Sequence, residues 1–182
     1  MKRHPYPLRG PLPARWLLSD ARGDAGLEAA LAKLPRGSGV VLRHYHLAEP
    51  ERAARLAQLT RLARARGLVV VRSGAMAEAR RRGADGAYGP AAALARGGTG
   101  LRLVTVHSLR EIARAGRRAD ALLLSPVFAT RSHPGGATLG VVRFRLLAAR
   151  AKVPVIALGG INARAAQRLK WPRWAAIDAF LR

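Results

Sequence analysis

The stretch Leu101-Arg102-Leu103-Val104-Thr105-Val106-His107-Ser108-Leu109-Arg110-Glu111 decides the fold class of this chain. Its first six residues are mostly apolar or β-branched and predict a buried strand that ends at Val106. Ser108 and Glu111 then form a Ser-x-x-Glu capping box, which marks the start of a helix. A strand that passes at once into a capped helix is one βα unit of a parallel sheet.

The same alternation repeats on both sides of this unit. Further strands are predicted at residues 16–19, 40–45, 68–71, 86–88, 121–124, 154–158 and 174–177. Further helices are predicted over residues 25–34 with Asp24 as N-cap, from Glu49-Pro50-Glu51 to Gly67, over 76–82, over 142–150, and over 163–169 with Asn162 as N-cap.

Eight strands with intervening helices predict an α/β fold, a single (β/α)8 TIM barrel. The chain has 182 residues, whereas a typical barrel has about 250, so we expect a short barrel with its last helix truncated. An open doubly wound sheet is the alternative, although no Gly-x-Gly-x-x-Gly follows the first strand. Residues 1–14 are expected to form a flexible, basic, proline-rich leader, and residues 15–182 the barrel domain.

The composition excludes several classes of function. Lys and Arg number 33 against 10 Asp and Glu, a net charge of +23, but the arginines are dispersed and aromatic residues make up only 5%. This pattern is typical of solvated helix faces and disfavours nucleic acid as a partner, because base stacking needs aromatic side chains. The lack of cysteine excludes disulfides and thiolate metal sites. No run approaches the ~20 apolar residues of a membrane span, so we expect a cytoplasmic protein without a membrane partner, and leave a homodimer open.

Reactive groups of such barrels lie in the loops at the carboxyl ends of the strands. Gly159 and Gly160 follow the seventh expected strand and precede a helix, where bare amides and the helix dipole favour a phosphate. A plain tight turn is the alternative interpretation of this pair. The long loop of residues 125–140 carries further groups able to hold an oxyanion, namely Thr130, Arg131, Ser132 and Thr138.

Taken together, these segments resemble the thiamine phosphate synthase/TenI family from about residue 16 to 177. The resemblance rests on Leu17-Leu18-Ser19-Asp20, Gly83-Ala84-Asp85-Gly86-Ala87-Tyr88, Val106-His107-Ser108, Ser125-Pro126-Val127-Phe128-Ala129-Thr130, His133-Pro134, Leu139-Gly140 and residues 154–162. The Pro-Val-Phe-x-Thr loop followed by Ile-x-x-Gly-Gly-Ile is fairly specific, whereas Gly-Ala-Asp-Gly occurs in many barrels.

The resemblance implies a thiamine-pathway protein that holds thiazole phosphate through the Gly159-Gly160 loop and the turn after the eighth strand. The synthase of this family joins a pyrimidine diphosphate to thiazole phosphate with loss of pyrophosphate, using Mg2+. The TenI branch shifts the double bonds of a thiazole phosphate carboxylate by proton transfer. In that branch a histidine in Val-His-Ser is the proposed acid/base, and His107 stands at that place, with a purely helix-flanking role as the alternative.

This sequence departs from the synthase pattern where the diphosphate and Mg2+ would bind. Where the family has Gln-x-Arg-x-Lys, this chain has Val41, Arg43 and Tyr45, so the arginine remains and the lysine is lost. Ser73-Gly74 replaces an Asn-Asp pair, and the segment after the fourth strand, Gly89-Pro90-Ala91-Ala92, lacks the usual aspartate. Mg2+ is expected from the family, but its carboxylate ligands are absent here and no metal site is predicted.

Two more departures concern anion contacts. His133 replaces a lysine, and Asp178 replaces a serine of the second phosphate turn, where its charge would repel phosphate unless it caps backbone amides. We therefore expect His107 as the acid/base, and a small phosphorylated heterocycle held by Arg43, Thr130, Ser132, His133, Gly159 and Gly160. These residues favour tautomerisation over the synthase reaction, and the alternative is a non-catalytic binder or regulatory paralogue that has lost the Mg–diphosphate site.

Three other side chains near the expected strand ends receive structural interpretations. His44 and His46 lie two apart on the second expected strand, opposite in direction to Arg43, so we expect both to face the helices, and metal binding is disfavoured. Asp20 is the lone carboxylate after the first strand, where a capping role is favoured over proton transfer.

Overall fold

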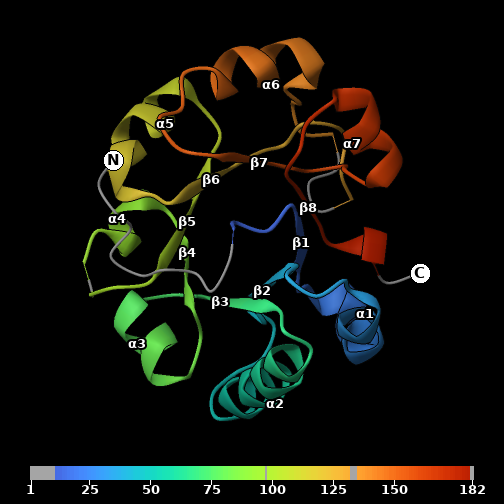
Figure 1. Cartoon of the computed structure of the whole chain (residues 1–182), viewed down its shortest axis with the longest axis vertical. Helices are drawn as coiled ribbons and strands as arrows, with labels where there is room; N and C mark the ends of the chain where they lie inside the picture. Colours follow the sequence, from blue (N-terminus) through green and yellow to red (C-terminus); the bar gives the residue numbers. More distant parts are fainter. Residues whose placement is uncertain (1–10, 97, 132–134, 181–182) are drawn as a thin grey trace.

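The computed structural model describes residues 11–96, 98–131 and 135–180, and these residues form a closed parallel barrel (Figure 1). The strands are β1 (Arg15–Leu18), β2 (Gly39–Leu42), β3 (Val69–Ser73), β4 (Gly86–Gly89), β5 (Leu101–Val106), β6 (Ala121–Leu124), β7 (Val155–Leu158) and β8 (Trp174–Ala176). Each strand pairs with the next, and β8 pairs back with β1, Trp174 lying opposite Arg15. The predicted (β/α)8 barrel is confirmed, and the open sheet is excluded.

Helices surround the ring of strands (Figure 1). They are α1 (Leu27–Lys33), α2 (Glu51–Ala65), α3 (Met76–Arg81), α4 (Ala91–Leu94), α5 (Leu109–Ala115), α6 (Gly140–Ala148) and α7 (Ala163–Leu169), with 3-10 turns η1 (Ala21–Gly26), η2 (Gly116–Arg118) and η3 (Asp178–Phe180). After β8 the described chain has only the turn η3, which lies between α7 and α1 (Figure 1). Within the described residues, no helix has the length and apolar character that crossing a membrane requires.

Side chains of the strands alternate between two apolar layers. On β6, Leu122 and Leu124 pack outward against the helices, whereas Ala121 and Leu123 pack into the barrel interior. This period of two is a property of extended backbone, and it makes every strand bury both of its faces. Because both faces are buried, each strand appears in the sequence as a short, continuous apolar run.

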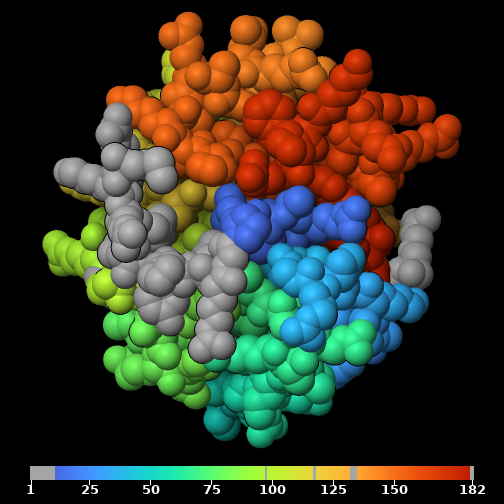
Figure 2. Space-filling view, viewed as in Figure 1, coloured from blue at the N-terminus to red at the C-terminus, as the bar shows by residue number. Residues whose placement is uncertain are grey.

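One end of the barrel is closed by the segment that enters β1. Leu12 packs against the interior cluster, and the indole Nε1 of Trp16 donates to the carbonyl of Pro13 at 2.9 Å. A Cβ on Gly39 would lie 2.2 Å from the Trp16 ring, so only glycine leaves room for the indole. Figure 2 shows the start of the described chain over the centre of this face. Residues 1–10 of the expected leader lie outside the described residues.

Side-chain caps explain the starts of α5 and α7, and one predicted cap is wrong. The side chains of Ser108 and Asn162 accept from the amides of Glu111 and Ala165, as their sequence positions predict. Asp24 does not cap the first helix, because the chain leaves β1 through the turn η1, which the side chain of Asp20 caps instead. The expected capping role of Asp20 is thereby confirmed.

Candidate functional site

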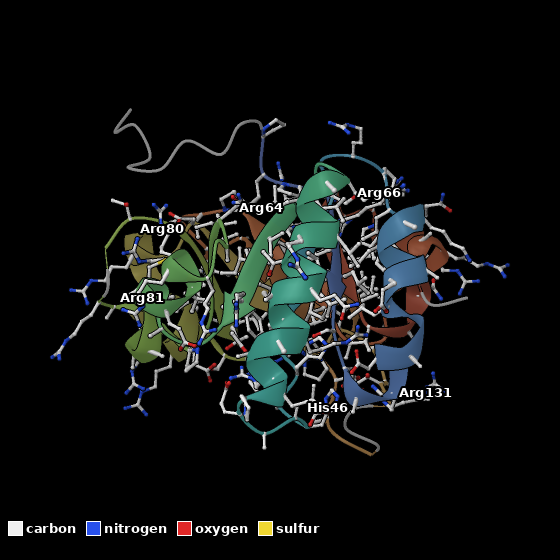
Figure 3. The ribbon with its side chains drawn as sticks, turned by 90° about the horizontal axis from the view of Figure 1, so that it is seen from below. His46, Arg64, Arg66, Arg80, Arg81 and Arg131 are labelled. Atoms are coloured by element: carbon white, nitrogen blue, oxygen red, sulfur yellow. The ribbon has the colours of Figure 1, made fainter. Side chains whose placement is uncertain are left out.

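Two cavities lie side by side at the carboxyl ends of the strands. The larger has a volume of about 650 Å³ and the smaller about 320 Å³, and Thr130 and Gly159 line both. Figure 3 shows Arg131, from the wall of the smaller cavity, at the end of the barrel opposite Arg64 and Arg66. The open end of the barrel is therefore the one at which barrels of this kind carry their sites.

The larger cavity is lined by polar side chains that follow the strands. They come from β1, β2, β4, β5 and β6 and the loops after them: Asp20, Arg43, Tyr45, Tyr88, Thr105, His107, Ser125 and Thr130. Val41 and Leu103 face the barrel interior, so Arg43 and Thr105, each two residues further on, continue on the same side.

His107 has one ring nitrogen fixed by a neighbouring strand. Its Nδ1 lies 2.9 Å from the carbonyl oxygen of Ser125 and 3.3 Å from the Ser125 hydroxyl. A carbonyl oxygen can only accept, so Nδ1 carries the proton in this contact and Nε2 carries the lone pair of the neutral ring. His107 is exposed and lines the larger cavity, and its Nε2 has the electronic form of a general base.

Arg43 is anchored by the end of β1. Its backbone amide donates to Ser19 Oγ at 2.7 Å, and its guanidinium Nε donates to the Ser19 carbonyl at 2.8 Å. Its Nη2 lies 3.5 Å from a carboxylate oxygen of Asp20. These bonds fix the guanidinium at the wall of the larger cavity, where the sequence predicts an anion contact.

Two acidic groups of this cavity have opposite pKa shifts. Burial acts to raise the pKa of Asp20, but hydrogen bonds from Arg22 and the charges of Arg22 and Arg43 outweigh it, so this pKa lies below its usual value. Burial raises the pKa of the Tyr88 phenol, against a smaller lowering by Arg43. At neutral pH Asp20 is therefore a carboxylate engaged by arginines, and Tyr88 is a neutral hydrogen-bond donor.

A chain of hydrogen bonds lies behind Arg43. Ser19 Oγ is 3.1 Å from His44 Nδ1, and His44 Nε2 is 3.1 Å from Asp24 Oδ1. Arg55 donates to the same Asp24 oxygen at 2.7 and 2.9 Å. Burial lowers the pKa of His44, which outweighs the hydrogen bond and charge of Asp24 that raise it. His44 is therefore neutral, accepting from Ser19 and donating to Asp24.

The prediction that His44 and His46 share one strand is wrong. β2 ends at Leu42, and His44 takes a left-handed backbone conformation with φ of 45°. The turn brings both rings to Asp24, with His46 Nε2 3.2 Å from Oδ2. His44 is buried at the contact between the β1 and β2 ends, and it serves the packing of this loop.

The smaller cavity lies between the ends of β6, β7 and β8. Gly159 and Gly160 have φ of 94° and 62°, and a Cβ on Gly160 would lie 2.4 Å from the carbonyl oxygen of Ala129. Leucine or valine cannot replace glycine where the backbone is left-handed and a neighbouring chain approaches so closely. Among the described residues, no acceptor is found for the backbone amides of Gly160 and Ile161.

Asp178 also lines the smaller cavity, together with Arg131. The guanidinium of Arg131 donates to Asp178 Oδ2 from Nε at 3.2 Å and from Nη2 at 2.8 Å. The carboxylate thus neither caps described backbone amides nor points away from the recess. The sequence does not show that Arg131 is the partner of Asp178.

The structure brings together most of the predicted site residues that it describes. Arg43, His107, Thr130 and Gly159 line the larger cavity, and Thr130, Gly159 and Gly160 line the smaller one. Ser132 and His133 lie outside the described residues. Sequence reasoning missed Thr105, although its place two residues beyond Leu103 on one strand face was a usable signal.

The residues at the ends of β3 and β4 do not fit a Mg2+ ion held by carboxylates. Ser73 and Gly74 follow Arg72, and Gly89 and Pro90 follow Tyr88, so neither end supplies an acid. Of the described residues, no group of three or more His, Cys, Asp or Glu is arranged to hold a metal. Asp20, the carboxylate of the larger cavity, is engaged by Arg22 and Arg43.

The fold and the position of the cavities define a (β/α)8 barrel whose two adjoining cavities lie at the carboxyl ends of the strands, where barrels of this kind carry their sites. Residues 19–177 match the model of the family described as Thiamine monophosphate synthase (TMP-TENI), and the chain belongs to this family.

Part of the chain is similar in sequence to one curated protein, and the whole barrel is similar in fold to solved structures. A protein of Aquifex aeolicus (strain VF5) named "Putative thiamine-phosphate synthase 2" is 38% identical over 59 residues, which are 32% of this chain and 32% of the relative's own length. The thiamine phosphate pyrophosphorylase of Pyrococcus furiosus superposes with a TM-score of 0.75 at 24% identity, covering 93% of this chain and 87% of that one.

Structural similarity by itself does not select a chemistry. An HpcH/HpaI aldolase/citrate lyase family protein from Burkholderia cenocepacia superposes with a TM-score of 0.64 at 18% identity, covering 94% of this chain and 91% of the other. Because one barrel hosts many reactions, the activity must be argued from the site.

Proposed function

We propose that this chain binds a thiazole phosphate in the two adjoining cavities and, when the ligand is the thiazole phosphate carboxylate, isomerises its ring by proton transfer through His107. The observation that carries the proposal is the 2.9 Å contact between His107 Nδ1 and the Ser125 carbonyl oxygen, which as an acceptor requires the proton on Nδ1. This leaves Nε2 as the basic atom at the cavity wall. Family membership supports the ligand class.

In this proposal the ligand divides between the cavities according to charge and size. The phosphate occupies the smaller cavity, where the amides of Gly160 and Ile161 are available. The heterocycle occupies the larger cavity, between Arg43 and Tyr88. Arg43 is suited to an anionic substituent of the ring, and the protonated phenol of Tyr88 to a ring heteroatom or carboxylate.

The reaction needs one residue to carry a proton. Nε2 of His107 takes a proton from one ring atom as the double bonds shift, and the imidazolium returns a proton to a second atom. The Ser125 carbonyl stabilises the charged ring through Nδ1, in the way that an acceptor orients a catalytic histidine. No diphosphate leaves in this reaction, so it does not need the carboxylates that the ends of β3 and β4 lack.

The proposal is tested by NMR on thiazole phosphate carboxylate in D2O. The wild-type chain is expected to isomerise the ring and to incorporate deuterium. His107→Ala should reduce the rate by about 10²–10⁴-fold, the usual contribution of a general base, while the dissociation constant changes little. His46→Gln is the matched control, because His46 lines neither cavity.

Each other outcome identifies a different function. Binding without isomerisation in the wild type would favour the non-catalytic binder. Release of pyrophosphate from the pyrimidine diphosphate in the presence of Mg2+ would establish the synthase reaction. A cytoplasmic location belongs to the same proposal, since a sequence without cysteine gives no reason to expect an oxidising compartment.

A further inference from the structure

The smaller cavity, the place proposed for the phosphate, carries an ion pair in its wall. Arg131 is the cationic side chain, and Asp178 the anionic one, among the described residues that line it. Both hydrogen bonds of the pair end on the same oxygen, Asp178 Oδ2. The side chain of Arg131 is 71% exposed and that of Asp178 33%, so the pair lies at the mouth of the recess.

Arg22, the neighbouring cation, is bound to Asp20 and so does not take the place of Arg131 as a phosphate contact. Arg22 lies close enough for Asp178 to raise its pKa, but the largest contribution is its hydrogen bond to Asp20. That bond is 2.7 Å long. A phosphate entering the recess therefore meets one arginine that is already bound to a carboxylate, and it also meets the charge of that carboxylate.

We infer that Asp178 is a specificity-determining residue that competes with the ligand's phosphate for Arg131. This inference rests on the proposed function. An exposed ion pair is weak, so a ligand with other contacts can open it, whereas free inorganic phosphate has few other contacts to offset the loss. The pair thus lowers the affinity for every phosphate-bearing ligand, so that at a given concentration only a phosphate whose heterocycle also fills the larger cavity is retained.

The arrangement of the two cavities sets the order in which the parts of the ligand bind. Thr130 and Gly159 line both cavities, so a ligand that spans them can seat its ring before its phosphate reaches Arg131. Arg131 then exchanges the Asp178 oxygen for phosphate oxygens, which accept two parallel bonds equally well. Asp178 is left at the mouth, where water can solvate it.

The test is calorimetric titration of thiazole phosphate, inorganic phosphate and the unphosphorylated thiazole alcohol into the wild type and Asp178→Asn. The substitution keeps the shape of the side chain and removes one negative charge. We expect thiazole phosphate and inorganic phosphate to bind about 3–10-fold more tightly, as removal of a like charge a few ångströms away implies. The alcohol should bind with unchanged affinity.

Two further variants isolate the cause. Glu51→Gln makes the same change in net charge on the exposed first turn of α2, and it should leave all three affinities unchanged. Arg131→Gln should weaken binding of both phosphate-bearing probes, because the cation is lost and the carboxylate remains. Thermal unfolding checks that each variant is folded.

The outcomes separate this inference from the function on which it rests. If the wild type binds thiazole phosphate but Asp178→Asn binds it equally or more weakly, the competition is wrong and the proposed function stands. An equal gain in Glu51→Gln would also overturn it, since net charge alone would then explain the effect. If neither the wild type nor Asp178→Asn binds thiazole phosphate at millimolar concentration, the proposed function fails and the inference with it.

Discussion

The two cavities at the open end of the barrel hold their arginines in different ways. Arg43, in the larger cavity, is bound through its amide and its Nε to Ser19, a buried residue at the end of β1. Arg131, in the smaller cavity, is bound through its guanidinium to Asp178 at an exposed position. Arg43 is anchored mainly by the uncharged groups of Ser19, with the Asp20 carboxylate at 3.5 Å, whereas Arg131 is bound directly to the carboxylate of Asp178 at 2.8 Å.

The contrast between the surroundings of Arg43 and Arg131 indicates which part of the site is rigid and which part can rearrange. Behind Arg43, a continuous set of hydrogen bonds runs through His44 and Asp24 to Arg55, and most of it is shielded from water. Polar networks of this kind fix geometry when every member has a partner. Among the residues that the structure describes, the Arg131–Asp178 pair has no such set of hydrogen bonds behind it, and exposed pairs of this kind contribute little stability. The larger cavity is therefore preorganised, and the smaller one is adjustable at its mouth.

The floor of the smaller cavity is nevertheless rigid, and Gly160→Ala should produce the largest effect. The left-handed backbone at 62° costs about 1–2 kcal/mol for alanine, and the contact with the Ala129 carbonyl adds a clash of similar size. We expect the free energy of unfolding in urea to fall by about 3 kcal/mol. Gly140→Ala is the control, since Gly140 has the same φ of 62° but no atom within 4 Å of the added Cβ. Equal losses in the two variants would contradict the close packing at Gly160.

Removal of Arg55 should produce the second largest effect. Arg55 donates to Asp24 and Glu28, and both carboxylates lose this partner in Arg55→Met. Breaking a partly buried network in this way costs about 2 kcal/mol. Arg61→Met, on an exposed position of the same helix, should change the urea midpoint little. A loss below about 0.5 kcal/mol for Arg55→Met would show that water replaces the arginine.

The pH dependence of stability should report on the same network. Burial lowers the pKa of His44, so the unfolded chain takes up this proton at a higher pH than the folded chain does. Stability from this residue is thus complete above the ordinary histidine pKa of about 6.5 and is lost as the pH falls below it. Urea unfolding between pH 7.5 and 5.5 should show a falling free energy.

The control for this prediction is a variant that removes the imidazole of His44 and keeps the backbone conformation of the loop after β2. Asparagine tolerates the left-handed conformation that His44 adopts, so His44→Asn is the appropriate variant. Its stability should depend less on pH over the same range. Below about pH 4, both proteins should lose further stability, because Asp20 and Asp24 have lowered pKa values in the folded chain. Identical pH profiles from 7.5 to 5.5 would contradict a neutral, buried His44.

The smallest effect is expected at the mouth of the smaller cavity. Arg131→Gln removes an exposed ion pair, so the free energy of unfolding should change by less than about 1 kcal/mol. The comparison with Arg55→Met then contrasts an unsupported ion pair with one embedded in a network. A loss as large as that of Arg55→Met would mean that the Arg131–Asp178 pair fixes the fold of the loop, and not only its charge.

Much of the fold could be predicted because it depends on local pattern. The bounds of β5, β6 and α7 agree with the sequence to the residue, since each is delimited by a cap or by a change of hydrophobic period. Two errors have physical causes. β2 ends three residues early because His44 turns left-handed, and α4, with only four residues, is too short to show a helical period.

The site was only partly predictable for a related reason. The predicted strand ends indicate which side chains gather at the open face. The sequence predicted in this way that Arg43, His107 and Gly159 lie there, and all three line the larger cavity. The hydrogen bonds of Asp24 could not be predicted from the sequence, because its partner His44 lies 20 residues away and its partner Arg55 lies 31 residues away. A cap was the better local interpretation of Asp24, and the tertiary contact overrode it.

From the sequence, the order of the elements, the barrel and the end of the barrel that carries the polar side chains could all be predicted. This was possible because hydrophobic periodicity and helix capping depend on only a few neighbouring residues. The tertiary structure alone decided which charges meet there. Arg131 and Asp178 lie 47 residues apart, on the loops after two different strands. Their pairing depends on the strand order, since β7 pairs with both β6 and β8 and so places the ends of those two strands at the two sides of one recess.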